Sequence, residues 1–325
     1  MDHQNKPYYN LTPDFILDAI DDIGFRTDGR LLALNSFENR VYQVGIEEEK
    51  PLIAKFYRPN RWTDEAILEE HQFLLQMAEA EIPVVAPIKN KNGETLHHIH
   101  GHRVTLFERK GGRPPELDIA ETRLWLGRFL GRIHAVGKQQ PFAHRPQLNT
   151  TTFGEDAIAN ILRSGFVPAH LQSNWEQTAQ SALAACKSIF DSLGTLDSLR
   201  LHGDCHPSNV LWTDNGPHFV DFDDSRMGPA IQDLWMLVSG DIDEQRNQLT
   251  DLLIGYEDFC EFDWREVKLI EPLRTLRMLH HSAWLCNRWE DPAFPAAFPW
   301  FTEGAYWEEQ TRLLSLQIAS ITNDE

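Results

Sequence analysis

Short apolar runs bounded by charged or turn-forming residues dominate the first third of the chain and predict β-strands there. Two such runs, Arg40–Ile46 and Pro51–Tyr57, are joined by the charged residues 47–50. A third run, Arg103–Glu108, is the last strand expected in this part of the chain. The strands therefore cluster near the N-terminus.

Helical spacing of apolar residues marks two segments around these runs. The first helix opens after Thr12, because a threonine N-cap followed by proline favours helix initiation. The second runs from Thr63 to about Ala80, and residues 1–10 are expected to lack regular structure. The apolar faces consist of Phe15, Ile16, Ala19 and Ile20 in the first helix and of Ile67, Phe73, Leu74 and Met77 in the second.

The remaining two thirds of the chain are mainly helical. Two glycines and two prolines in Lys110–Pro115 interrupt regular structure and predict a hinge at about 106–113. A helix follows from Glu116 to near His134, then a loop over 137–155 and further helices. The last hundred residues are rich in aromatic side chains. We favour core packing for these side chains, and the alternative is a wall of a substrate site.

One stretch interrupts this helical part and carries the candidate chemistry. Val210–Trp212 and His218–Val220 flank an Asn-Gly turn, which predicts a β-hairpin. A polar loop with Asp204 and Asn209 precedes the hairpin and Asp221 follows it, so we expect the three side chains to meet. This set suits magnesium-assisted phosphoryl transfer. Asp204 would accept the proton of an attacking hydroxyl group, while Asn209 and Asp221 would hold the metal.

Any one of these residues alone is typical of a solvated turn, but their order resembles a known pattern. His202-Gly203-Asp204 followed by Asn209, and then the segment 221–224, is similar to the catalytic residues of the aminoglycoside phosphotransferase and choline kinase superfamily. That superfamily shares the protein-kinase fold. Three further segments resemble bacterial stress-response serine/threonine kinases within it, namely Leu34–Tyr42, Lys55–Pro59 and Asp233–Leu237.

The resemblance extends from about residue 11 to the region of Trp307 and implies the fold class. We expect an α+β, bilobal, protein-kinase-like fold. Its small N-terminal, nucleotide-binding lobe, residues 1–107, would contain an antiparallel sheet. Its larger and mostly helical C-terminal lobe, residues 108–325, would carry the catalytic and substrate-binding groups.

The resemblance also assigns Lys55 to the nucleotide site. Lys55 lies in an apolar strand, close to the Val-Ala-Ile-Lys pattern of kinases. A buried ammonium group needs a carboxylate partner, since burying it unpaired is costly. Glu69 and Glu70 on the next helix are the candidates, and the family pattern favours Glu70.

The usual glycine-rich phosphate loop is absent from the chain. Asn35–Asn39 stands in its place, where backbone N–H groups with the side chains of Ser36 and Asn39 would bind phosphate. The alternative is an ordinary turn. We expect the adenine ring to meet the backbone near Leu106 and Glu108.

Only eleven residues separate Asp221 from Asp233. This spacing leaves no room for a long activation loop or its Ala-Pro-Glu anchor, so regulation by loop phosphorylation is not expected. In the family, the position of Asp233 braces the catalytic loop without reacting.

The charge of the chain limits the kinds of molecule that it is expected to bind. The chain has 325 residues, with 30 basic against 49 acidic side chains and a net charge of −19. This balance argues against nucleic acid and against anionic membranes as partners. The chain has neither an apolar signal core at the start nor an apolar run of about 18 residues, so we expect a cytoplasmic protein. We also expect the protein to act as a monomer. The four cysteines form no Cys-x-x-Cys pair, although Cys205 in the catalytic loop leaves redox sensitivity open.

The leading hypothesis is an ATP- and Mg²⁺-dependent kinase that phosphorylates serine or threonine hydroxyls of proteins and acts in a stress response. The expectation that the acceptor is a protein comes from the resemblance to the stress-response kinases. The alternative is a small-molecule kinase that acts on choline, homoserine or an aminoglycoside. A pseudokinase is disfavoured because Lys55, Asp204, Asn209 and Asp221 are all present.

Overall fold

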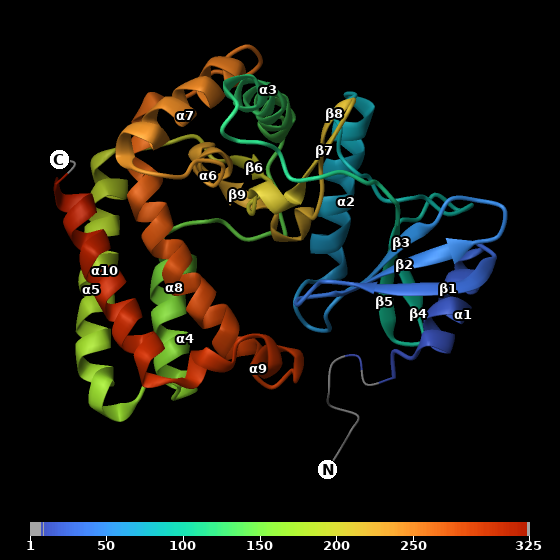
Figure 1. Ribbon diagram of the computed structural model, residues 1–325, viewed down its shortest axis with the longest axis horizontal. Helices are drawn as coiled ribbons and strands as arrows, with labels where there is room; N and C mark the ends of the chain where they lie inside the picture. Colours follow the sequence, from blue (N-terminus) through green and yellow to red (C-terminus); the bar gives the residue numbers. More distant parts are fainter. Residues whose placement is uncertain (1–7, 9, 324–325) are drawn as a thin grey trace.

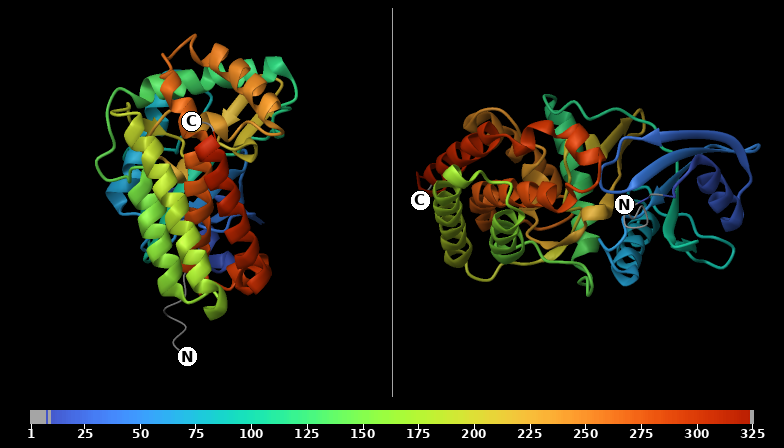
Figure 2. Two further views of the ribbon diagram at one scale, coloured as in Figure 1. Left: turned by 90° about the vertical axis from the view of Figure 1, so that its left-hand side faces the viewer. Right: turned by 90° about the horizontal axis from the view of Figure 1, so that it is seen from below.

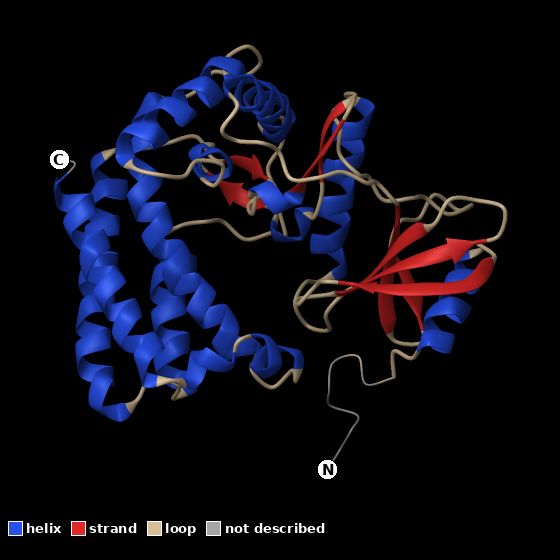
Figure 3. Ribbon diagram, in the orientation of Figure 1, coloured by secondary structure: helices blue, strands red, loops and turns tan. Residues whose placement is uncertain are grey.

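The computed structural model of the chain describes residue 8 and residues 10–323. Most of the irregular stretch expected over residues 1–10 therefore lies outside the described residues. The strands of the larger sheet gather on one side of the molecule and most helices on the other (Figures 1 and 3). The expected α+β architecture with two lobes is confirmed. In the described part of the chain, no helix is both long and apolar enough to cross a membrane.

The small lobe is an antiparallel sheet with strand order β1-β2-β3-β5-β4. Helix α1 covers one face, where Ile20 packs with Ala54 and Leu106. Alternation along the strands turns Ile53 and Lys55 to the opposite face, which opens into a cavity. The elements are α1 (Pro13–Ile23), β1 (Thr27–Leu34), β2 (Arg40–Ile46), β3 (Leu52–Phe56), α2 (Asp64–Glu79), β4 (His97–Ile99) and β5 (His102–Glu108).

The two expected helices and three expected strands of this lobe are present, but the sequence pattern does not predict β1 or β4. Strand β1 is an edge strand with mostly exposed side chains, and its apolar residues, 31–34, occupy only its second half. Asp28-Gly29 also interrupts it with a turn signal. The structure accommodates these residues by a shift in register between Thr27 and Leu31, with Gly29 at a φ of 83°.

The large lobe is mainly helical. Helices α4, α5, α8 and α10 run side by side (Figures 1 and 2). The elements are α3 (Ala120–Gly137), α4 (Asp156–Ser164), α5 (Ala169–Ser192), β6 (Leu199–Leu201), β7 (Val210–Thr213), β8 (Gly216–Phe219), β9 (Arg226–Gly228), α6 (Ile231–Trp235), α7 (Ile242–Tyr256), α8 (Ile270–Arg288), α9 (Ala293–Ala297) and α10 (Gly304–Asn323).

The predicted hairpin is confirmed as β7 and β8. The stretch 225–229, expected to be only a turn, contains a short strand instead. This strand, β9, pairs with β6, which leads into the loop that carries Asp204 and Asn209. Its partner is remote in the chain, so the local pattern could not reveal it.

The C-terminal aromatic residues divide between core and surface. Phe294, Phe301 and Trp307 are fully buried in the large-lobe core, as we favoured. Trp264 and Trp300 are exposed. The core prediction therefore holds for part of this group only.

Helices α3 and α7 pack closely because glycines lie at their contact. A Cβ atom at Gly127 would come within 1.9 Å of the carbonyl oxygen of Leu252. A Cβ atom at Gly255 would come within 2.1 Å of the carbonyl oxygen of Leu124. Both obstacles are backbone atoms, so a side chain could be accommodated only if the helices moved apart.

We predict that Gly127→Ala destabilises the protein by about 1–3 kcal/mol, because overpacking outweighs the better helix propensity of alanine. Gly304→Ala is the matched control, since a Cβ atom there meets no atom within 4 Å. Chemical denaturation of both variants is the measurement. Equal stability of Gly127→Ala and the wild type would contradict the packing argument.

Candidate active site

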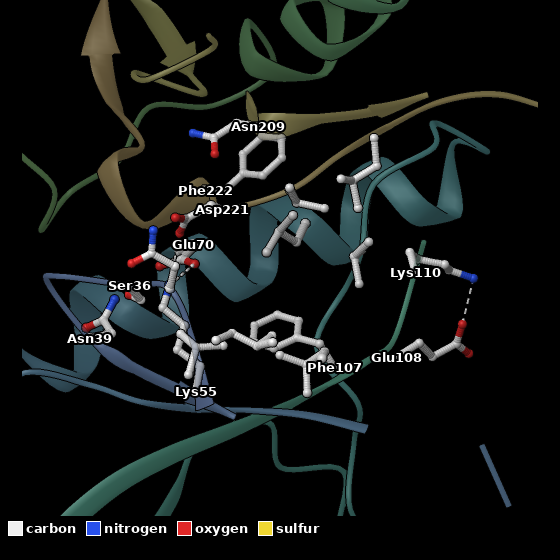
Figure 4. Close-up of a pocket in the computed structure, with 18 residues that line it drawn as sticks. Ser36, Asn39, Lys55, Glu70, Phe107, Glu108, Lys110, Asn209, Asp221 and Phe222 are labelled. Atoms are coloured by element: carbon white, nitrogen blue, oxygen red, sulfur yellow. Dashed lines mark hydrogen bonds and ion pairs between the residues drawn. The ribbon is translucent and has the colours of Figure 1, made fainter. Parts of the chain in front are cut away.

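A cavity of about 280 Å³ lies between the sheet of the small lobe and the β7–β8 hairpin of the large lobe (Figure 4). Its lining includes most of the residues that the sequence nominated, although they come from both lobes. These residues are Ser36, Asn39, Lys55, Glu70, Glu108, Asn209 and Asp221. The cavity therefore brings together side chains separated by up to 185 positions, from Ser36 to Asp221.

Lys55 lies at the centre of a group of carboxylates. Its Nζ atom is 2.9 Å from Asp223 Oδ1, 3.6 Å from Asp221 Oδ1 and 3.7 Å from Glu70 Oε1. Burial alone would lower the pKa of Lys55, but the charges of Asp223 and Glu70 raise it well above its usual value. The side chain is thus a fixed cation facing the cavity.

The two candidate glutamates differ in their surroundings. Glu70 is buried and forms an ion pair with Arg145 at 2.7 Å in addition to its contact with Lys55. Glu69 instead accepts backbone N–H groups from Ala143 and His144 at 2.6 and 2.9 Å. The structure therefore places Glu70, and not Glu69, beside the lysine.

Asp221 follows β8 and projects its carboxylate into the cavity (Figure 4). Its backbone adopts the left-handed conformation, with φ 61° and ψ 60°, which is uncommon for a residue with a side chain. Its position in the cleft removes water from the carboxylate and, with the charges of Asp223 and Asp224, raises the pKa of Asp221, while Lys55 opposes the rise. The side chain still keeps 58% of its surface exposed. A strained backbone that holds an anion among other anions is typical of a functional position.

Asp204 and Asn209 lie on the loop before the hairpin. The Asn209 amide nitrogen donates to the carbonyl oxygen of Asp204 at 3.0 Å, so its amide oxygen remains available as a ligand. The carboxylate of Asp204 does not line the cavity but pairs with Arg277 at 2.7 Å and His206 at 3.4 Å. Burial opposes ionisation, yet His206 and Arg277 together lower the pKa of Asp204 below its usual value.

The expected brace of this loop is confirmed in its geometry. Asp233, fully buried, accepts the backbone N–H groups of His202 and Gly203 at 2.8 and 2.9 Å. His134 Nε2 lies 3.0 Å from the same carboxylate. Gly203 has a φ of 85°, and a Cβ atom there would approach the carbonyl oxygen of Asp224 to 2.3 Å. The loop conformation therefore requires glycine at this position.

The side chain of Leu106 packs in the core under α1, and its carbonyl oxygen accepts the N–H group of Ile88 at 2.8 Å. Because side chains alternate along a strand, neighbouring Phe107 faces the cavity. Contact between the adenine ring and the backbone near Leu106 stays a prediction. Glu108 lines the cavity and pairs with Lys110 at 2.8 Å.

The side-chain oxygen atoms of Asn209 and Asp221 suit a divalent cation that also binds phosphate. Among residues 10–323 and residue 8, no cluster of three histidine, cysteine, aspartate or glutamate side chains could hold a metal by itself. Magnesium, however, commonly binds one or two protein oxygens together with phosphate and water. The Asp221 carboxylate and the Asn209 amide oxygen, at one end of the cavity, meet that requirement.

Cys205 is fully buried behind the loop. Burial, with the charges of Asp233 and Asp204, raises the pKa of its thiol well above the usual value. Because the thiolate is the reactive form, this environment disfavours a redox role. The four cysteines are all free thiols.

Sequence reasoning missed several residues that fix the site. Asp223 contacts Lys55, Arg145 contacts Glu70, and Arg277 contacts Asp204. Asp223 belongs to the matched motif, so its proximity to Asp221 was a usable signal. The arginines belong to no motif, and no local pattern could have identified them.

We predict that Asp233→Asn lowers the free energy of unfolding by about 3 kcal/mol, because it breaks a buried charge network and removes an acceptor from the loop. Asp258→Asn is the matched control, since its ion pair with Arg128 is exposed and should contribute at most about 1 kcal/mol. Denaturant titration compares the two. Equal losses in both variants would refute the bracing role.

Comparison with known sequences identifies relatives along nearly the whole chain. Stress response kinase A of Escherichia coli O157:H7 is 45% identical over 311 residues, covering 96% of this chain and 94% of that protein. Serine/threonine protein kinase RdoA of Salmonella typhimurium is 43% identical over 304 residues, covering 94% of this chain and 92% of that protein. The expected resemblance to stress-response kinases is confirmed.

Solved structures support the same fold at much lower sequence identity. An amicoumacin kinase in complex with AMP-PNP and Ca²⁺ is 18% identical, with a TM-score of 0.72 over 96% of this chain and 93% of that one. A microcompartment-associated aminopropanol kinase is also 18% identical, with a TM-score of 0.73 over 95% and 98%. The model of the phosphotransferase enzyme family matches residues 30–270. The chain therefore belongs to this phosphotransferase family, as a kinase related to stress response kinase A.

Proposed function

We propose that this kinase transfers the γ-phosphoryl group of ATP to serine or threonine hydroxyls of proteins and requires Mg²⁺. The observation that carries the proposal is one cavity lined by Lys55, Asn209 and Asp221, with Asp204 on the loop that also carries Asn209 and hydrogen-bonded to it. The printed name of the Salmonella relative supports a protein acceptor. A stress-response role rests on the names of the relatives.

In this proposal each residue has a separate task. Lys55 attracts the phosphate oxygens, while the side chains of Ser36 and Asn39 donate hydrogen bonds to them. The acceptor oxygen forms the new bond to the γ-phosphorus, the bond to the β-bridging oxygen breaks, and Asp204 receives the hydroxyl proton. A carboxylate of low pKa is a weak base, which suits a loose transition state in which the proton leaves late.

Asn209 and Asp221 would hold Mg²⁺. When bound, the cation neutralises charge that develops on the phosphate oxygens. It would also offset the repulsion between Asp221 and its acidic neighbours that raises the pKa of Asp221.

We propose that the acceptor reaches Asp204 through a second cleft, between α4 and α8. Phe153, His280 and Trp284 are among its lining residues. His280 lies one helical turn from Arg277, which pairs with Asp204. The acceptor would then approach from the large lobe while ATP lies under the small lobe.

We retain residues 1–107 and 108–325 as the two lobes, closing about a hinge at 106–113. The linker is tied to the hairpin by hydrogen bonds between Arg113 and Trp212, at 3.0 and 2.7 Å. Closure of the lobes would exclude water from the transferred group. These hydrogen bonds hold the end of the linker at Arg113, so the proposed closure would bend the segment before it.

Asp204→Asn should keep its fold and its affinity for ATP but lose turnover by about 10²–10⁴-fold, the range for a removed general base. Asp214→Asn in the hairpin turn is the matched control and should retain turnover. The measurements are a labelled-ATP transfer assay and calorimetric ATP binding. Near-wild-type turnover of Asp204→Asn would refute its assignment as the base.

Asp221→Ala should impair magnesium-dependent turnover more than Asn209→Ala, because magnesium prefers a carboxylate to a neutral amide. Titration of activity against Mg²⁺ at fixed ATP measures the effect. If Asp221→Ala kept the magnesium requirement of the wild type, its role as a metal ligand would be wrong.

Activity should require no prior phosphorylation. The segment between Asp221 and Asp233 folds into a short turn, strand β9 and the start of α6, so it leaves no long loop for a phosphate to order. Protein made without other kinases and treated with phosphatase should label a generic protein substrate without a lag. Activity lost on phosphatase treatment would contradict this prediction.

The same assay distinguishes the alternative function. The amicoumacin and aminopropanol kinases share the fold and are named for small molecules. Rapid phosphorylation of choline, homoserine or an aminoglycoside, with no labelling of protein, would replace the proposed acceptor with a small molecule.

A further inference from the structure

The Asn35–Asn39 loop of the small lobe, which joins β1 to β2, is attached to the large lobe. The ring centroid of Phe37 lies 5.1 Å from that of Phe298 and 6.1 Å from that of Phe294. Phe37 therefore packs against the core of the large lobe. Ser36 and Asn39, which flank this anchor, line the cavity.

Glu38 strengthens this attachment, because its carboxylate contacts side chains of both lobes. Its carboxylate accepts Trp284 Nε1 at 2.6 Å and Arg288 Nε at 2.9 Å, both from α8. On the small-lobe side, Arg58 Nε lies at 3.1 Å and Arg61 Nε at 3.6 Å. The side chain is only 13% exposed, so these charges interact with little screening by water.

Arg58 carries this contact back to the phosphate-facing residues. Its guanidinium donates to the carbonyl oxygens of Glu38 and Phe37 at 2.9 and 3.0 Å. Its backbone N–H group donates to the amide oxygen of Asn39 at 3.1 Å. Asp291 of the large lobe accepts from Arg58 at 2.7 Å. The conformation of the loop thus depends on groups in both lobes.

Arg61 extends the network to the lysine. It pairs with Asp223, and Asp223 pairs with Lys55 at 2.9 Å. Contacts therefore link Glu38 both to Asn39, through Arg58, and to Asp223, which pairs with Lys55.

We propose that Glu38 is a positioning residue for the nucleotide site. It holds the loop against α8 in the conformation that presents Ser36 and Asn39 to the phosphates. The proposal rests on the proposed function, because it assumes that the cavity binds ATP. Loss of the contact should weaken ATP binding. The KM for the acceptor does not test the proposal, because Trp284 and Arg288 also line the second cleft.

The test uses Glu38→Gln, Arg288→Gln and the double variant that combines these two substitutions. Glu309→Gln is compared with all three. Glu309 is the matched control, because its pair with Arg312 is exposed on α10. Hydrogen exchange over residues 34–40 without nucleotide measures docking of the loop. Calorimetry measures the Kd for ATP, steady-state kinetics separate KM from kcat, and a melting curve monitors the fold.

Each single variant should show faster exchange in the loop and a Kd for ATP about tenfold higher than that of the wild type. The double variant should bind ATP no more weakly than either single variant, because both substitutions break the same contact between Glu38 and Arg288. The control should match the wild type. A wild-type Kd in Glu38→Gln, with or without a lower melting temperature, would overturn the positioning role. Failure of the wild type to bind ATP would refute the proposed function instead, a separate result.

Discussion

The buried ammonium group of Lys55 is the constraint on which the rest of the site depends. A cation in this position is stable only if carboxylates surround it, and they arrive from different elements. Glu70 comes from α2, whereas Asp221 and Asp223 come from the segment after β8. These ion pairs therefore hold strand β3, helix α2 and the segment after β8 together at the cavity between the lobes.

Charges of alternating sign continue outward from Lys55 in two directions. On one side, Glu70 leads to Arg145, whose side chain also donates to backbone carbonyl groups of Asp223 and Ser225. On the other side, Asp223 leads to Arg61 and Glu38, and Glu38 leads to Arg288. Each ion has a partner of opposite sign, so the low-dielectric interior strengthens the network. The network crosses between the lobes where the phosphates are proposed to bind.

Local sequence patterns predicted the elements that carry apolar runs or capping residues. The hairpin, the helix after Thr12 and the strand with Lys55 are of this kind. Strand β1 was not predicted because Asp28-Gly29 gives a turn signal within it and its apolar and polar residues do not alternate. The expected adenine contact near Leu106 concerns the backbone, so the direction of the Leu106 side chain, which faces the core, does not decide it. Arg145, Arg277 and Glu38 could not be assigned because their partners lie 75, 73 and 250 positions away in the chain.

The most direct test of the account is the affinity of the nucleotide for Lys55→Ala. Calorimetric titration with ATP and Mg²⁺ should give a Kd at least about tenfold higher than that of the wild type, since a charge-assisted contact to phosphate is lost. Lys187→Ala is a suitable control, because Lys187 pairs with Glu155 at the surface of the large lobe and does not line the cavity. That variant should bind ATP more nearly like the wild type. Wild-type affinity in a folded Lys55→Ala protein would contradict the central claim that this lysine organises a nucleotide site.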